Sequence, residues 1–121
     1  MTVEEVAALL GLRVLAGRDL RRVVTGGYAS DMLSCVMAKA KEGNIWVTLQ
    51  AHQNVIAVAS LLNLAAIVIT EGVEPDIDTL TRAEEQGVVI LSSPGTTFTV
   101  AGQLYEAGIR GARTDVAVSA G

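Results

Sequence analysis

Three short runs of the chain are apolar almost from end to end, and they limit the possible folds more than any other feature. The runs are residues 45–49, 66–69 and 88–91. A strand with one face in water alternates apolar and polar residues, whereas a strand buried on both faces does not. Strands buried on both faces are typical of parallel sheets covered by helices. The runs therefore predict an α/β domain: a mostly parallel sheet with helices on both faces.

The segments around these runs repeat a strand, a turn and a helix. We expect strands at residues 22–25, 45–50, 65–70 and 88–91. Helices should follow them at about residues 30–41, from after Asn54 to about residue 62, at 76–86 and at 96–107. Gly43, Gly87 and Gly108 stand where three of these helices must stop, because glycine enters the left-handed conformation without steric cost. The repeated unit is supersecondary, and the sequence shows no linker between units.

The amino-terminal part is predicted to carry a short helix and two short strands. Thr2 and Glu5 have the spacing of a capping box, in which each residue satisfies a backbone N–H of the other. Strands are expected at residues 12–16 and 20–25, around a turn at 17–19. At the other end, residues 110–121 are either an edge strand or a frayed tail. With 121 residues, the chain is expected to form one domain, residues 1–121.

Charge and cysteine content exclude several classes of protein. Nine basic residues against thirteen acidic ones give a net charge of −4, whereas a nucleic-acid binder carries a basic patch that neutralises phosphates. A single cysteine, Cys35, leaves no internal disulfide and no multi-cysteine metal site. Residues 44–70 lack charge over a length that could cross a bilayer, but polar residues and a change of period favour two strands and a helix. We expect a cytoplasmic protein without a membrane segment.

Candidate binding residues follow the predicted strands. The carboxyl ends of parallel strands share one edge of the sheet, and ligands bind in the crevice above that edge. The residues placed there are Thr25, Gly26, Gly27, His52, Gln53, Asn54, Thr70, Glu71, Gly72, Ser92, Ser93, Thr96 and Thr97. This set predicts a small-molecule site, although polar residues in loops also serve simply to cap helices.

Signatures of catalysis are incomplete. The chain has no Gly-x-x-x-x-Gly-Lys-[Ser/Thr] loop for phosphates, and Gly26-Gly27 fits a tight turn better than a dinucleotide fingerprint. His52, the only histidine, would need a rim carboxylate such as Asp31 or Glu71 to act as an acid or base. We therefore expect no catalytic residue, no metal and no cofactor.

The segment from Trp46 to Gly108 resembles the DRTGG domain family. The resemblance lies in residues 45–54, in residues 66–75 and in residues 91–101, which include Thr97-Phe98-Thr99. In this alignment His52-Gln53 occupies the family's Asp-Arg position, and Thr70-Glu71-Gly72 its Thr-Gly-Gly position. The family is associated with CBS domains and some phosphotransacetylases, and is distantly like the N-terminal domain of bifunctional HPr kinases.

The resemblance implies a non-catalytic regulatory or ligand-sensing domain that binds a small molecule or a protein partner at the strand carboxyl ends. A small enzyme using His52 and a purely structural interaction subunit are the alternatives. A homodimer is expected because the predicted third helix and the residues after it are apolar on more than one face. Those apolar residues are Ala57, Ala59, Leu61, Leu62 and Leu64.

Overall fold

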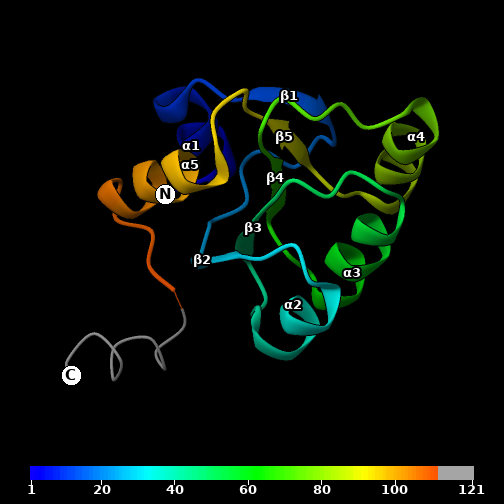
Figure 1. Cartoon of the computed structure of the whole chain (residues 1–121), viewed down its shortest axis with the longest axis horizontal. Coiled ribbons are helices and arrows are strands. Elements are labelled where there is room, and N and C mark those ends of the chain that lie inside the picture. The colour runs from blue at the N-terminus through cyan, green and yellow to red at the C-terminus, as the bar shows by residue number, and fades with distance from the viewer. Residues whose placement is uncertain (112–121) are drawn as a thin grey trace.

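The computed structural model describes residues 1–111 and shows an α/β fold (Figure 1). Its elements in chain order are α1 (Val3–Leu10), β1 (Arg13–Ala16), β2 (Gly26–Ala29), α2 (Leu33–Lys39), β3 (Asn44–Thr48), α3 (Asn54–Leu62), β4 (Ala66–Ile69), α4 (Ile77–Gln86), β5 (Ile90–Ser92) and α5 (Thr97–Glu106). The predicted helix that ends at about residue 62 is confirmed as α3, which begins one residue earlier than expected, at Asn54.

The five strands form one sheet in the order β1-β5-β4-β3-β2. Strands β2, β3, β4 and β5 are parallel to one another. Strand β1 lies at the edge and pairs with β5 in the antiparallel sense. The prediction of a mostly parallel sheet is confirmed. Because β2 to β5 lie side by side in chain order, their carboxyl ends form a single continuous edge.

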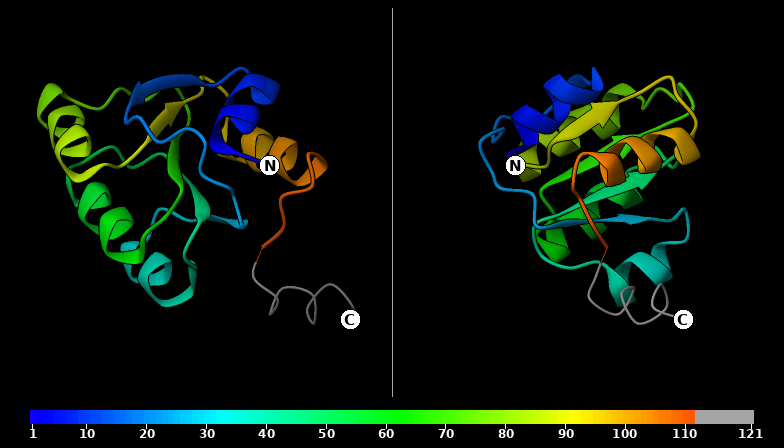
Figure 2. Two further views of the ribbon diagram at one scale, coloured as in Figure 1. Left: turned by 180° about the vertical axis from the view of Figure 1, so that it is seen from behind. Right: turned by 90° about the vertical axis from the view of Figure 1, so that its left-hand side faces the viewer.

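Helices cover both faces of the sheet, as predicted (Figure 1). The crossover helices α2, α3 and α4 lie on one face, and α1 and α5 lie beside each other on the opposite face. The two further views in Figure 2 show the same layers, with α1 in blue next to α5 in orange. Neighbouring parallel strands joined by one helix repeat the same right-handed crossover, which returns each helix to the same face.

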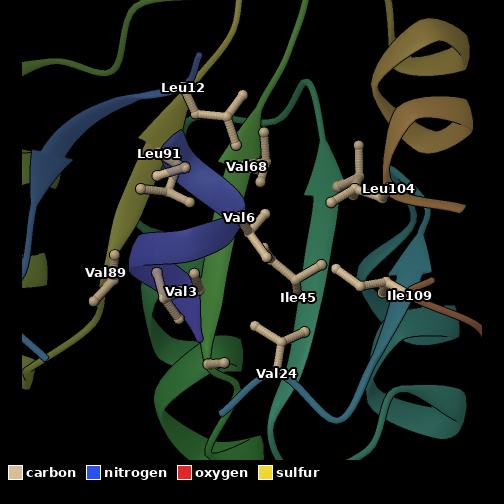
Figure 3. Close-up of a cluster of buried hydrophobic side chains, with 14 of the residues drawn as sticks. Val3, Val6, Leu12, Val24, Ile45, Val68, Val89, Leu91, Leu104 and Ile109 are labelled. Carbon is tan, nitrogen blue, oxygen red and sulfur yellow. The ribbon is translucent and has the colours of Figure 1, made fainter. Parts of the chain in front are cut away.

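Two apolar cores fill the space between the sheet and its helices. Successive side chains of a strand point to opposite faces, so Ile45 and Val47 of β3 join the core under α1 and α5 while Trp46 joins the core under α2 to α4. Figure 3 shows the first of these cores, in which Val3 and Val6 of α1 lie over the strands. The uninterrupted apolar runs of the sequence are thus explained by burial on both sides.

The caps of α1 and α4 match the sequence pattern, whereas the helix expected to run to Gly43 is shorter: α2 spans Leu33–Lys39 and ends at Ala40. Thr2 accepts a hydrogen bond from the backbone N–H of Glu5, and the Glu5 carboxylate accepts one from the backbone N–H of Thr2. These bonds form the predicted capping box. Gly87 ends α4 in the left-handed conformation, at φ 70°.

The strand predicted at residues 20–25 is wrong. Residues 20–25 form a turn and an isolated bridge between Thr2 and Val23, and β2 begins only at Gly26. The Gly26-Gly27 pair is therefore neither a turn nor a phosphate loop but part of a strand. Glycine is needed there for a different reason: a Cβ atom on Gly26 would lie only 2.8 Å from the carbonyl oxygen of Arg110. The same oxygen accepts a hydrogen bond of 2.9 Å from the N–H of Gly27.

The partner of β1 also differs from the local pairing that the predicted turn at 17–19 suggests. Arg13 pairs with Ser92 and Val14 with Leu91, so β1 joins the far edge of the sheet. The proposed edge strand or frayed tail lies mostly in residues 112–121, outside the described residues. Within residues 1–111, no helix has the length and apolar character required to span a bilayer.

Candidate functional site

The carboxyl ends of β2 to β5 open into four loops, which we call the carboxyl rim together with the first two residues of each following helix. The rim comprises residues 30–34, 49–55, 70–78 and 93–98. Hydrogen bonds tie each loop to the next loop or to the end of the next strand. Leu49 N–H donates to Asp31 at 2.9 Å, Thr70 N–H donates to the carbonyl of Thr48 at the end of β3 at 3.0 Å, and Glu71 N–H donates to the Gly95 carbonyl at 2.8 Å. The four loops therefore form one connected surface.

At the β2–β3 corner of the rim, the carboxylate of Asp31 ties two loops together. One oxygen, Oδ1, accepts from the hydroxyl of Thr48 at 2.7 Å and from the backbone N–H of Leu49 at 2.9 Å. The buried Thr48 hydroxyl in turn accepts from the backbone N–H of Gln50 at 3.1 Å. Asp31 is thus committed to holding the loop after β3.

At the β4–β5 corner, Thr70, Thr97 and Glu71 form a second network. The hydroxyls of Thr70 and Thr97 are 2.7 Å apart, and Thr70 is fully buried. The carboxylate of Glu71 accepts from the backbone N–H of Thr97 at 2.8 Å, at the amino end of α5, where a negative charge is favoured by the helix dipole. Glu71 reaches this position from a left-handed backbone, at φ 62°.

The serines and Thr96 of the predicted site also have internal roles. Ser92 and Ser93 are buried, and the hydroxyl of Ser93 accepts from Gly95 N–H at 3.0 Å. Thr96 is the N-cap of α5, where its hydroxyl accepts from Thr99 N–H at 3.1 Å. Most of the polar groups predicted to bind a ligand therefore stabilise the rim itself.

His52, Gln53 and Asn54 form the predicted part of the loop after β3. His52 and Asn54 are exposed and Gln53 is half-buried. The Nδ1 atom of His52 accepts from the backbone N–H of Asn54 at 3.3 Å. Gly72, in the next loop, is exposed as well, and its N–H donates to the Ser93 carbonyl.

The structure does not assemble a catalytic group from His52, Asp31 and Glu71. Among residues 1–111, no hydrogen bond joins His52 to either carboxylate, because each carboxylate binds the backbone of another loop. The carboxylate that interacts electrostatically with His52 is that of Asp76. The pKa of Asp76 lies below its ordinary value, chiefly because the backbone N–H of Thr79 donates to it, and the positive charge of His52 adds to this effect.

Three predicted site residues lie away from the rim. Thr25 precedes β2 and Gly26 and Gly27 lie within it, so Thr25 stands at the opposite, amino edge of the sheet. There its hydroxyl donates to the Glu42 carbonyl at 2.8 Å. The error follows from the misplaced strand: the loop after β2 is Ser30-Asp31-Met32, and these residues occupy the place given to Thr25–Gly27.

Sequence reasoning also missed the exposed apolar side chains of the rim. Each of its four segments presents one: Met32, Leu49, Ile77 and Phe98. A signal was available for Phe98. In α5 the side chains of Val100 and Leu104 are buried, and a residue two positions before Val100 lies about 200° away around the helix.

Two open hollows of the surface lie elsewhere. One, of about 330 Å³, is lined by Leu9, Leu10, Gln103, Glu106 and Ala107 of α1 and α5 and the residue after it. The other, of about 530 Å³, lies beside Gly17 and the end of α4. In the described part of the chain, no three His, Cys, Asp or Glu side chains gather into a metal site.

Comparison with known proteins identifies a family and a fold. The sequence profile of the DRTGG domain matches residues 5–107. A solved structure with the same fold is that of the CBS and DRTGG domains of the regulatory region of Clostridium perfringens pyrophosphatase, complexed with its activator diadenosine tetraphosphate. The TM-score is 0.71 at 16% identity, over 85% of this chain and 45% of that one. A search of curated proteins finds no similar sequence.

Proposed function

The chain belongs to the DRTGG domain family, and from this we propose that it is a non-catalytic regulatory domain that acts by binding. The solved relative is a regulatory region rather than a catalytic one. Our chain spans 45% of that relative's length, so the activator named for the relative is not carried over to this chain. The proposal concerns the mode of action: a small molecule or a protein partner is recognised at the carboxyl rim.

The observation that carries the proposal is the use of the rim's polar groups. Asp31 and Glu71 each accept hydrogen bonds from the backbone of a neighbouring loop, and the hydroxyls of Thr70 and Thr97 bond each other. A general acid or base must instead reach the substrate directly or through one water. The arrangement supports a rigid platform for binding better than it supports a reaction centre.

The charge of the rim narrows the ligands that it would accept. The rim segments contain five carboxylates and no lysine or arginine; the acids are Asp31, Glu71, Glu74, Asp76 and Asp78. A polyphosphate would have to be held by helix amino ends alone, and the amino end of α5 already binds the carboxylate of Glu71. A neutral or singly charged ligand at His52, Gln53, Asn54 and Gly72, or a protein partner, fits this surface better.

The test compares the wild type with His52→Ala in two assays. In a thermal-shift screen of nucleotides, neutral metabolites and divalent metals, we expect a ligand that raises the melting temperature of the wild type and acts less on the variant. In hydrolase and phosphotransfer assays, we expect both proteins to be equally inactive. Turnover by the wild type that His52→Ala abolishes would replace the proposal with an enzyme.

The second candidate function is a structural interaction subunit. It is favoured by the same observation, because a rim whose polar groups satisfy one another needs no small ligand to complete it. In this case the thermal-shift screen would find no small molecule, and a protein partner would be required.

A homodimer and a cytoplasmic location stay predictions. Of the apolar residues that suggested a dimer, Ala59 and Leu64 are buried in the core, whereas Leu61 remains exposed on α3. Sedimentation velocity measures the assembly state directly.

A further inference from the structure

The carboxyl rim carries four exposed apolar side chains. The exposed fractions are 88% for Phe98, 73% for Ile77, 61% for Met32 and 38% for Leu49. One side chain comes from each rim segment, and the hydrogen bonds of Asp31, Thr70 and Glu71 hold these segments against one another. The side chains are therefore presented on a fixed support.

Helix geometry explains why two of these side chains must point outward. In α4 the first buried residue is Thr79, and in α5 it is Val100. Ile77 and Phe98 each stand two positions earlier, which is about 200° around the helix from the buried face. Phe98 is the only phenylalanine of a chain with 3% aromatic residues, and it lies in water and not in the core.

The rim combines these side chains with charge of one sign. Its five acids are accompanied by no lysine or arginine from its own segments, and the one ion pair described there joins Glu74 to Arg13 of β1 at 3.3 Å. A two-fold contact between the rims of two copies would set these acids against each other, which is unfavourable. The same charge disfavours nucleic acid and anionic membranes.

We infer that the carboxyl rim docks a protein partner that presents apolar side chains flanked by lysine or arginine, such as a basic amphipathic helix. Phe98 and Met32 are the anchors, since aromatic residues and methionine are enriched in interfaces, and the rim acids supply complementary charge. The inference rests on the proposed function and gives it a class of partner.

The first experiment uses the full chain, labelled with ¹⁵N, and two synthetic helical peptides. Both peptides carry one stripe of leucines; one has lysine on either side of the stripe and the other has glutamate at the same positions. We expect the lysine peptide to bind and to shift the amide resonances of residues 30–34, 49–55, 70–78 and 93–98. The glutamate peptide should leave the resonances unchanged, and added salt should weaken binding of the lysine peptide.

Variants provide the matched control. Phe98→Ala should weaken binding of the lysine peptide at least about tenfold, as expected for an anchor. Met32→Ala and Met37→Ala form a pair on the same helix region, because Met32 precedes α2 at the rim while Met37 lies exposed near the other end of α2. Met32→Ala should weaken binding and Met37→Ala should not.

Each other outcome overturns the inference. These outcomes are absence of binding, shifts outside the rim, equal binding of both peptides, or equal loss in Met32→Ala and Met37→Ala. Self-association of the chain alone that Phe98→Ala abolishes would make a second copy the occupant, with the rim against the basic residues Arg21, Lys39 and Lys41. The small-molecule screen distinguishes these failures from failure of the regulatory function, because a ligand acting through His52 does not require Phe98.

Discussion

The two corners of the carboxyl rim are each held by a carboxylate, but the two carboxylates accept different numbers of hydrogen bonds. Asp31 and Glu71 each bring a carboxylate to a backbone N–H of the neighbouring loop, at 2.9 and 2.8 Å. Asp31 also accepts from the buried hydroxyl of Thr48, whereas Glu71 has one such bond and a left-handed backbone, at φ 62°. We therefore expect the contacts of Asp31 to contribute more to the stability of the fold than the side chain of Glu71.

Replacing Asp31 should have the largest effect. Asp31→Ala removes both hydrogen bonds and leaves the Thr48 hydroxyl donor unsatisfied inside the protein. Hydrogen bonds to charged groups contribute roughly 1.5–3 kcal/mol each at most, so we expect a loss of about 2 kcal/mol in the free energy of unfolding. Urea denaturation measures it. Asp31→Asn keeps an accepting oxygen and should lose less unfolding free energy than Asp31→Ala. Equal losses in the two variants would contradict the role given to the accepting oxygen of Asp31.

The Thr70–Thr97 pair should come next. Thr70→Val keeps the shape of a fully buried side chain and removes its hydroxyl, leaving Thr97 without this partner. We expect a loss of about 1 kcal/mol in unfolding free energy. Thr97→Ser, which keeps the hydroxyl, is the control and should remain near the wild type. A Thr70→Val protein as stable as the wild type would remove the network from the β4–β5 corner.

Two substitutions at Glu71 separate its backbone from its side chain. Glu71→Ala loses the carboxylate at the amino end of α5, which contributes about 0.3–1 kcal/mol, and keeps an unfavourable left-handed residue. Glu71→Gly loses the same carboxylate but relieves about 1 kcal/mol of backbone strain. We therefore expect the glycine variant to be at least as stable as the wild type and the alanine variant to be less stable, by thermal denaturation. The reverse order would contradict the comparison.

The smallest effect should appear as a pH dependence at the third carboxylate, Asp76. Its pKa is lowered from 3.8 by the N–H of Thr79 and by His52. A carboxylate with a lowered pKa stabilises the fold above its unfolded-state pKa, and this contribution disappears as the pH falls through the folded-state value. Asp76→Asn should flatten the decline in stability below about pH 4. An Asp76→Asn protein whose stability declines as steeply as that of the wild type would contradict this expectation.

The sequence predicts the buried parts of this protein better than its rim. The apolar runs at residues 45–49 and 66–69 predict the central strands correctly because burial on both faces leaves few alternatives. The sequence does not predict the strand of Gly26-Gly27, because the need for glycine there comes from the close approach of the Arg110 backbone. That residue is distant in the sequence, so no local pattern contains the contact. The sequence places polar residues after the strands, but it does not show which groups inside the protein they bond. Asp31 and Glu71 bond across loops, and the distance between loops is set only by the assembled sheet.

The pairing of β1 with β5 has a consequence for the order in which the chain can fold. Strands β2, β3 and β4 each pair with the next strand along the chain, which follows after one helix. Strand β1 pairs with β5 instead, so Arg13 can pair only once Ser92 has been made. During synthesis from the amino end, β1 therefore stays unpaired until nearly all of the described chain exists, and contacts between distant residues are the slow ones to form. We therefore expect β1 to join the sheet only after β5 has been made.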